Sequence, residues 1–143
     1  MQAKLVAIVG ADEFKWKNER QKALARDVIR ALLLMHKAEG PIILVSGGCP
    51  KGGVDIWAEE IADELGIDTL IFKPEKPHYY YYMKRNKRIA EACDVIYAIV
   101  PMFNLRSGAI ATLRMATEMG KPGYIIEVGE ESVKIRLDRG REK

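Results

Sequence analysis

The sequence predicts an α/β domain built on a parallel β-sheet, with helices on both faces. Five short apolar stretches, typical of strands buried on both sides, alternate along the chain with segments of helical periodicity. Such alternation forms a parallel sheet through right-handed crossovers. The predicted strands are residues 4–9, 42–46, 67–73, 94–100 and 122–128. Residues 1–143 are expected to form a single domain, because this length suffices for one hydrophobic core.

The first helix is predicted to begin after Asn18 and to end near Ala38. Asn18 followed by Gln21 is typical of a helix N-cap with a capping box. Apolar residues at helical spacing predict the buried face, namely Leu24, Val28, Leu32 and Met35. Leu33 and Leu34 widen this apolar arc, which indicates either deep burial or a contact between subunits.

The later elements follow from the same signals. A second helix begins at Val54 and places one apolar stripe on the core, namely Val54, Trp57, Ala58, Ile61 and Leu65. A third helix is predicted for residues 79–92, and a fourth between an N-cap at Ser107 and Gly120. Alternation of apolar and charged residues over 133–138 predicts an extra antiparallel edge strand at the C-terminus. Residues 139–143 are predicted to be a frayed tail.

Composition narrows the function classes. A hydrophobic content of 48%, a charged content of 30% and a net charge of +3 describe an ordinary globular domain. Basic and acidic residues are interspersed, which argues against nucleic acid as the partner. No apolar run approaches the roughly 20 residues of a membrane span, and the first residues carry no signal peptide. With only two cysteines and no metal-ligand spacing, we expect a cytoplasmic protein with no metal and no cofactor.

A glycine-rich loop follows the second strand and is the strongest functional signal. Two glycine pairs, Gly47-Gly48 and Gly52-Gly53, lie between Ser46 and the second helix. Glycine lets a phosphate approach the backbone closely, and the free N–H groups and dipole of a helix start attract anions. The loop is not a Walker A motif, because Lys51 is followed by glycine rather than by Ser or Thr. The alternative is a turn that needs glycine for its geometry alone; two pairs in seven residues favour anion binding.

The glycine-rich and polar loops are predicted to meet at one place. Residues 10–17, 46–53, 74–78 and 101–107 all follow strands. In a parallel sheet such loops lie at the carboxyl edge, where ligands bind at the point at which the strand order reverses. The predicted ligand-binding residues are Gly10, Ser46, Gly47, Gly48, Gly52, Gly53, Asp55, Arg85, Asn86, Ser107 and Gly108.

Several short motifs follow one pattern along the chain, namely Ser46-Gly47-Gly48, Gly53-x-Asp55, Arg85-Asn86, Asp94, Gly108 and Gly120-Lys121-Pro122. Together they resemble the SLOG superfamily of Rossmann-like proteins, named for the Smf/DprA and lonely-guy proteins, and in particular its small stand-alone YspA-type branch. The resemblance covers roughly residues 4–127 and is strongest in the segment SGGCPKGGVD.

This resemblance implies a three-layer fold with sheet order 3-2-1-4-5 and a nucleotide or nucleotide derivative at the sheet edge. Gly47, Gly48 and Gly53 would line the phosphate loop, and Gly108 would open the fourth helix beneath a phosphate. Asp55 would cap its helix or meet a ribose hydroxyl. Arg85 and Asn86 would face the ligand, since Arg offers a bidentate fork for phosphate. The superfamily's members often associate, so the resemblance also implies a homo-oligomer.

Two departures from the superfamily's pattern bear on catalysis. The family often has Gly-Thr where this chain has Gly108-Ala109, so a phosphate-binding hydroxyl is missing. Lonely-guy phosphoribohydrolases place a catalytic glutamate three residues further on, where this chain has Thr112. The resemblance therefore supports nucleotide binding better than catalysis, and the sequence leaves enzymatic activity undecided.

Two alternative functions remain open. The first is a nucleotide-processing hydrolase that cleaves an N-glycosidic or phosphate bond, with Asp55 or a carboxylate of loop 10–17 as the base. Glu59 is a further carboxylate near the predicted site. The second is a single-stranded DNA-binding protein like the DprA relatives, because the basic segment 84–88 adjoins the tyrosines 79–82.

The roles of three further features are open in the sequence. Trp16 could cover the ligand, fill a gap in the first loop or lie in an interface. At least one of the tyrosines Tyr79 to Tyr82 is expected to be exposed, because four consecutive residues cover most of a helix's circumference. An anion hole near Cys49 could lower the pKa of its thiol, although a small loop residue is the favoured interpretation.

Overall fold

The computed structural model describes residues 2–105 and 107–140, so the last residues of the predicted tail lie outside the described part. Six strands form one sheet in the order β3-β2-β1-β4-β5-β6. The first five are parallel and β6 pairs antiparallel with β5. The predicted order 3-2-1-4-5 and the C-terminal antiparallel edge strand are therefore both confirmed.

The strands alternate with four helices, as predicted. The strands are β1 (Lys4–Gly10), β2 (Ile42–Ser46), β3 (Asp68–Ile71), β4 (Val95–Pro101), β5 (Gly123–Val128) and β6 (Val133–Asp138). The helices are α1 (Glu19–Glu39), α2 (Val54–Glu64), α3 (Tyr79–Ala92) and α4 (Gly108–Glu118), with a short 3-10 turn η1 (Glu13–Lys15) after β1.

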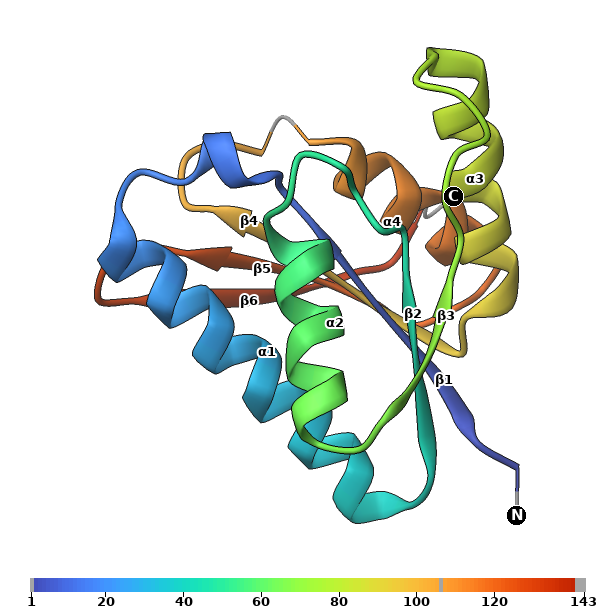
Figure 1. Cartoon of the computed structure of the whole chain (residues 1–143), viewed down its shortest axis with the longest axis horizontal. Coiled ribbons are helices and arrows are strands. Elements are labelled where there is room, and N and C mark those ends of the chain that lie inside the picture. Colours follow the sequence, from blue (N-terminus) through green and yellow to red (C-terminus); the bar gives the residue numbers. More distant parts are fainter. Residues whose placement is uncertain (1, 106, 141–143) are drawn as a thin grey trace.

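The helices form two layers around the sheet. Helices α1 and α2 pack together on one face, and α3 and α4 pack together on the other (Figure 1). One apolar cluster lies on each face: Ile8, Leu44 and Ile99 point toward α1 and α2, whereas Val9, Val45 and Ala98 point toward α3 and α4. This division follows from the strand period of two, which sends neighbouring side chains to opposite faces.

The predicted third strand, 67–73, is too long. Strand β3 covers only Asp68–Ile71, and all its residues are exposed because it is the edge of the sheet. The amide of Ile67 does not pair with β2; it donates to the carbonyl of Ala62 at 2.8 Å and closes the end of α2. Strands β2 and β6 match their predictions, β1 and β5 differ from theirs by one residue at one end, and β4 is shifted by one residue.

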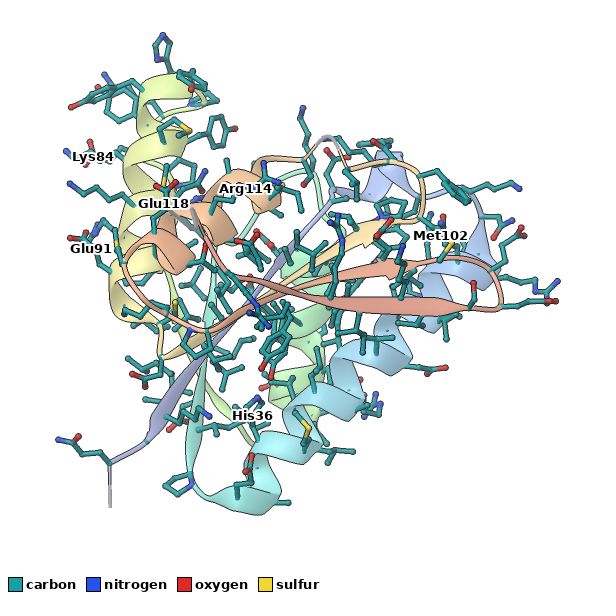
Figure 2. All side chains as sticks on the ribbon, turned by 180° about the vertical axis from the view of Figure 1, so that it is seen from behind. His36, Lys84, Glu91, Met102, Arg114 and Glu118 are labelled. Atoms are coloured by element: carbon teal, nitrogen blue, oxygen red, sulfur yellow. The ribbon has the colours of Figure 1, made fainter. Side chains whose placement is uncertain are left out.

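The buried face of α1 is rotated from the predicted one. Ala25, Ile29 and Leu33 are fully buried, whereas Leu24, Val28 and Leu32 only flank the core and Met35 is 49% exposed. The small side chain of Ala25 lets the helix lie against the sheet. The buried face ends in His36, whose ring nitrogen Nε2 lies 2.6 Å from the hydroxyl of Tyr97 (His36 is labelled in Figure 2). Because His36 is polar, a search for apolar residues at helical spacing does not find it.

The start of α1 is capped, but not by the predicted capping box. The Asn18 side chain accepts a hydrogen bond from the Gln21 amide at 3.0 Å, as an N-cap should. The Gln21 side chain accepts from the amide of Lys17 instead of that of Asn18, and its NH₂ group donates to the carbonyl of Val128 at 2.9 Å. Burial of Gln21 thus ties α1 to the end of β5.

None of the helices within residues 2–105 and 107–140 combines the length and the apolar character needed to cross a membrane.

Candidate functional site

A cavity of about 230 Å³ lies at the carboxyl ends of β1 and β2, between α3 and α4; we call it the main cavity. Strands β1 and β4 are neighbours, but the chain leaves β1 toward one face of the sheet and leaves β4 toward the other. Diverging loops at such a point leave a crevice. Seven of the predicted ligand-binding residues line it, namely Gly10, Gly47, Asp55, Arg85, Asn86, Ser107 and Gly108.

Asp55 is the central polar group of the main cavity. It lies in the first turn of α2, as the resemblance implied, but it does not cap that helix. Its Oδ2 accepts a hydrogen bond from the backbone N–H of Cys49 at 3.2 Å and so closes the glycine loop. The residue is only 6% exposed, and Oδ1 is buried without a hydrogen bond of normal geometry among the described residues, although the backbone N–H of Gly10 favours the ionised carboxyl. A buried acceptor without a donor is rare in folded proteins, so Oδ1 is suited to accept a hydrogen bond from a ligand in the cavity.

The environment of Asp55 changes its acidity. Burial raises the pKa of its carboxyl from 3.8 to about 6, against the opposing effect of the nearby Arg85 charge. The Glu59 carboxylate adds a smaller effect in the same direction as burial. A carboxyl that titrates near neutral pH inside a cavity can accept a hydrogen bond from a ligand or exchange a proton with it.

Arg85 projects from α3 toward the glycine loop. Its Nη1 donates to the carbonyls of Gly47 and Phe72, the latter at 3.3 Å, and its Nε donates to the side chain of Asn86 at 2.9 Å. Among the described residues, Nη2 has no hydrogen-bond partner. These bonds use the Nε hydrogen and both Nη1 hydrogens, so they hold the guanidinium in place and leave the two Nη2 hydrogens to contact an anion in the cavity.

Gly47 allows Arg85 and Asp55 to approach each other. A Cβ at this position would lie 2.5 Å from Nη1 of Arg85 and 2.9 Å from Oδ2 of Asp55. A side chain here would therefore push apart the cation and the carboxylate of the site. The glycine at position 47 is explained by the site's own geometry, not by a turn.

The N-terminus of α4 forms the opposite wall. Ser107 is the N-cap, as predicted, and its hydroxyl accepts from the amide of Ala109 at 3.2 Å. Among the described residues, no atom lies within 4 Å of where a Cβ of Gly108 would stand, and the φ of Gly108 is not positive. Neither the packing of these residues nor the backbone conformation therefore requires a glycine there. The hydroxyl of Thr112 donates to the carbonyl of Gly108 at 3.1 Å. The helix start thus presents backbone to the cavity, with no carboxylate at position 112.

The remaining predicted glycines either lie outside the main cavity or are required by packing. Gly48 and Gly52 line a neighbouring cavity, described below, rather than the main one. At Gly10, a Cβ would clash with the carbonyl of Ile99 and with Val54; at Gly53, it would clash with the backbone of residues 11 and 12. Close packing against β4 and α2 therefore explains the glycine at position 10, and close packing against the β1 loop explains the one at position 53. The alternative that the sequence left open, turn geometry, also applies to Gly53, because its φ is +82°.

Ser46 lies beneath the glycine loop and supports it. It is completely buried, and its hydroxyl donates to Oε2 of Glu59 at 2.7 Å while accepting from the amide of Gly48 at 3.3 Å. It lines neither cavity. Ser46 therefore stabilises the conformation of the glycine loop through its hydrogen bonds to Gly48 and Glu59 and does not contact the cavities.

Sequence reasoning missed two lysines of the main cavity. Lys15 and Lys51 line it and bring positive charge from the loops after β1 and β2. Asp12, a carboxylate of loop 10–17 that was considered as a base, also lines it, as does Tyr82 from the tyrosine run. Lys51 lies within the glycine loop itself, and Tyr82 precedes Arg85 by three residues on α3, so it shares a helix face with a predicted residue. That spacing was the available signal for Tyr82.

A second cavity of about 540 Å³ adjoins the main one. Its walls are the loop 48–52, the outer side of α2 at Ile56 and Glu59, and the loop 73–77. Cys49 and Tyr82 line both cavities, so the two share a border. The sequence analysis predicted that loops 46–53 and 74–78 meet at this edge of the sheet, but not that they enclose a separate cavity.

The structure decides between the interpretations of Trp16 and corrects that of Cys49. Trp16 is 6% exposed, its ring lies 5.6 Å from that of Trp57, and its Nε1 donates to the carbonyl of Ala11 at 3.2 Å; it fills a gap in the first loop. Burial raises the pKa of the Cys49 thiol, which is opposite to the lowering by an anion hole that we considered.

The tyrosine run behaves as the helical geometry predicted. Tyr79 and Tyr80 are 75% and 60% exposed, on the turns of α3 that project beyond the rest of the molecule (Figure 1). Tyr81 and Tyr82 are half-buried, and the guanidinium of Arg85 lies 5.7 Å from the ring centre of Tyr82. Lys84, on the same helix, points outward (Figure 2). Binding of single-stranded DNA to this helix stays a prediction.

Within the described part of the chain, no group of three or more His, Cys, Asp or Glu side chains is placed to hold a metal ion.

Comparison with known proteins supports the fold. No protein-family model and no curated protein matches the chain. Among solved structures, the chain is similar to the molybdenum cofactor carrier protein MCP from Chlamydomonas reinhardtii, with a TM-score of 0.62 and 18% sequence identity. The match covers 87% of this chain and 76% of that chain. At this identity the similarity shows a shared Rossmann-like fold, and membership of the SLOG superfamily stays a prediction.

Proposed function

We propose that this protein binds a small phosphorylated ligand, a nucleotide or nucleotide derivative, in the main cavity. The observation that carries the proposal is the convergence on one cavity of the α4 N-terminus, the Arg85 guanidinium and the unpartnered Oδ1 of Asp55. A helix N-terminus and a guanidinium attract phosphate, and an unpartnered carboxylate oxygen accepts an O–H or N–H.

The charges of the cavity fit a ligand with both anionic and hydrogen-bond-donating groups. Lys15, Lys51 and Arg85 line it together with Asp12 and Asp55. A phosphate placed between Gly108 and Arg85 meets the positive end of the α4 helix dipole and a cation. A hydroxyl of an attached sugar supplies the donor that Asp55 lacks, which agrees with the ribose contact implied by the SLOG resemblance.

The structural neighbour supports ligand binding in general. It is a carrier of molybdenum cofactor, so this fold serves in at least one protein to hold a small ligand. The ligand panel for this chain therefore includes molybdenum cofactor beside inorganic phosphate, ribose 5-phosphate, nucleoside monophosphates and dinucleotides.

Replacing Arg85 by Lys is expected to weaken the binding of ribose 5-phosphate and of nucleoside monophosphates by about tenfold or more. The ammonium keeps the charge but loses the Nη2 donors and the hydrogen bonds that hold the guanidinium in place. A hydrogen bond to a charged group contributes about 1.5–3 kcal/mol. Isothermal titration calorimetry measures the change.

The matched control for this variant is Arg88→Lys on the same helix. The guanidinium of Arg88 stacks on Phe72 at 5.0 Å and lies outside the main cavity, so its replacement should leave affinity within about twofold. Equal affinities for wild type and Arg85→Lys would contradict the placement of the anion beside Arg85.

Hydrolysis of the bound nucleotide is a second candidate function, and the buried Asp55 carboxyl supports it. Its pKa of about 6 and its unpartnered oxygen suit a general base that activates water. Chromatography of nucleoside monophosphates after long incubation should then show released base or phosphate with wild type and at least about 100-fold less with Asp55→Asn. Absence of products with wild type across the panel leaves binding as the function.

We also propose that the chain associates with itself, as the SLOG resemblance implies. Leu34 and Met35 on α1 are 47% and 49% exposed, and Ile135 on β6 is 60% exposed, so apolar side chains remain to be covered. Sedimentation velocity measures this directly, and a monomer at all concentrations would refute it.

A further inference from the structure

The main cavity by itself is small for the proposed ligand. Sites for small molecules and cofactors usually measure about 300–1,000 Å³. The main cavity measures about 230 Å³, and the second cavity beside it measures about 540 Å³. The main cavity alone falls below the usual range, whereas the second cavity lies within it, so a nucleotide whose phosphate lies between Arg85 and Gly108 has room for its other half in the adjoining second cavity.

We propose that the two cavities form one bipartite site, in which the main cavity holds the phosphorylated end of the ligand and the second cavity holds a planar heterocycle with N–H donors. This inference rests on the proposed function and deepens it by naming the second half of the ligand. Cys49 and Tyr82 line both cavities, so a ligand that passes these two side chains occupies both spaces.

The walls of the second cavity suit a flat ring. Ile56, Pro50 and Pro74 supply apolar surface, and the phenol ring of Tyr82 forms the border with the main cavity. Tyr82 already lies under the guanidinium of Arg85, so one aromatic ring adjoins both the proposed phosphate position and the proposed ring position. Stacking on an aromatic side chain and apolar packing are the usual means of holding a base.

Glu59 supplies the preference for N–H donors. Its Oε2 accepts the hydroxyl of Ser46 at 2.7 Å, which fixes the carboxylate at the cavity wall. Its Oε1 has no hydrogen-bond partner in the part of the chain that the structure describes. A fixed, half-buried carboxylate oxygen favours a heterocycle with an N–H at that edge and disfavours one that presents only acceptors.

The test compares a ligand with a ring and one without it. Guanosine 5′-monophosphate carries both halves, whereas ribose 5-phosphate carries only the phosphorylated half. We expect guanosine 5′-monophosphate to bind wild type roughly tenfold or more tightly, since base stacking makes a contribution of that size. Both affinities are measured by isothermal titration calorimetry.

Two variants locate the ring. Ile56→Trp fills the second cavity and should reduce the affinity for guanosine 5′-monophosphate to that for ribose 5-phosphate, while leaving the latter within about twofold. Glu59→Gln keeps an acceptor for Ser46 but removes the charge, and should weaken guanosine 5′-monophosphate alone by about tenfold. Glu60→Gln, on the same helix but exposed and outside the second cavity, is the matched control and should change neither affinity.

The free cysteines give a second, independent measurement. Cys49 stands at the border of the cavities, whereas Cys93 is completely buried and serves as the internal control. We expect guanosine 5′-monophosphate to slow alkylation of Cys49 several-fold more than ribose 5-phosphate does, as measured by mass spectrometry, and Cys93 to stay unmodified with both.

The outcomes separate this inference from the function on which it rests. If the two ligands bind with equal affinity and Ile56→Trp and Glu59→Gln change nothing, the bipartite site is refuted while phosphate binding in the main cavity stands. If neither ligand binds wild type, the bipartite site and the proposed function are both refuted. If Ile56→Trp fails to fold, Glu59→Gln and the alkylation rates still decide.

Discussion

Asp55→Asn is expected to raise the free energy of unfolding at pH 8 by up to about 3 kcal/mol in the absence of ligand. The pKa of this carboxyl is 3.8 in an ordinary setting and about 6 in the folded chain, mainly because of burial. Above pH 6 the carboxyl is ionised in both states, and the folded state bears the full cost of a buried charge. An amide has no such cost, and its oxygen still accepts from the amide of Cys49.

The stability difference between Asp55→Asn and wild type is expected to increase with pH. Between pH 4 and 6 the folded chain holds a proton on Asp55 that the unfolded chain has lost, so the contribution of Asp55 to stability falls as the pH rises. The difference between variant and wild type should therefore grow from near zero at pH 4 to its maximum above pH 7. His36 acts in the opposite direction, because burial lowers its pKa, but it is present in both proteins and cancels in the difference.

Urea unfolding at several pH values from 4 to 8 measures both curves. Asp63→Asn, at an exposed position of the same helix, is the control and should change stability by no more than about 0.5 kcal/mol. A difference between Asp55→Asn and wild type that is flat with pH, or a loss of stability in the variant at pH 8, would contradict the account of Asp55.

A stabilising Asp55→Asn has a functional meaning. A residue that costs the free protein stability and lies in a cavity is typical of a binding or catalytic group. We therefore expect the same variant to be more stable without ligand and to gain less stability from added nucleoside monophosphate than wild type does.

Gly53→Ala is expected to have the second large effect, a loss of at least about 2–3 kcal/mol of unfolding free energy. Gly53 has a φ of +82°, which L-residues rarely adopt, and a Cβ there would lie 2.6 Å from the carbonyl carbon of Asp12. The obstructing atoms are backbone atoms of the β1 loop, which cannot move without displacing that loop from α2. Conformational strain and overpacking therefore add.

Gly52→Ala is the matched control for this loss. Gly52 has a similar φ of +77°, but its nearest contact for a Cβ is 3.5 Å away at Glu13. Its replacement has only the conformational cost of about 1–2 kcal/mol. Denaturant unfolding of both variants at one pH should give a clearly lower free energy of unfolding for Gly53→Ala than for Gly52→Ala. Equal losses would show that packing against the β1 loop does not determine the glycine at position 53.

The fold could be predicted from the sequence because its signals are local. Apolar runs such as 95–100 and helix caps such as Asn18 and Ser107 act within a few residues, and alternation of strands and helices then limits the topology. Which residues of a helix are buried was harder to predict. His36 belongs to the buried face of α1 only because the Tyr97 hydroxyl, 61 positions away, meets it.

The site could be predicted only in part, for the same physical reason. Gly47, Arg85 and Gly108 were found through short motifs, and the structure places them around one cavity. The glycine pattern could not show that Gly10 and Gly53 are required by packing, since their neighbours come from distant segments. The burial of Asp55 and the second cavity likewise depend on how separate loops meet, which no local pattern encodes.

The measurement that tests the central claim most directly is a titration with a nucleoside monophosphate followed by ¹H–¹⁵N correlation NMR, at a chain mass of 16.1 kDa. If the ligand binds in the main cavity, the largest shifts should fall on the amides of Gly47, Gly108 and Ala109 and on the Nε–H of Arg85, with Gly66 and Gly120 unmoved. Shifts confined to other surfaces, or none at millimolar ligand, would contradict the proposal that the N-terminus of α4 and Arg85 together hold a phosphate.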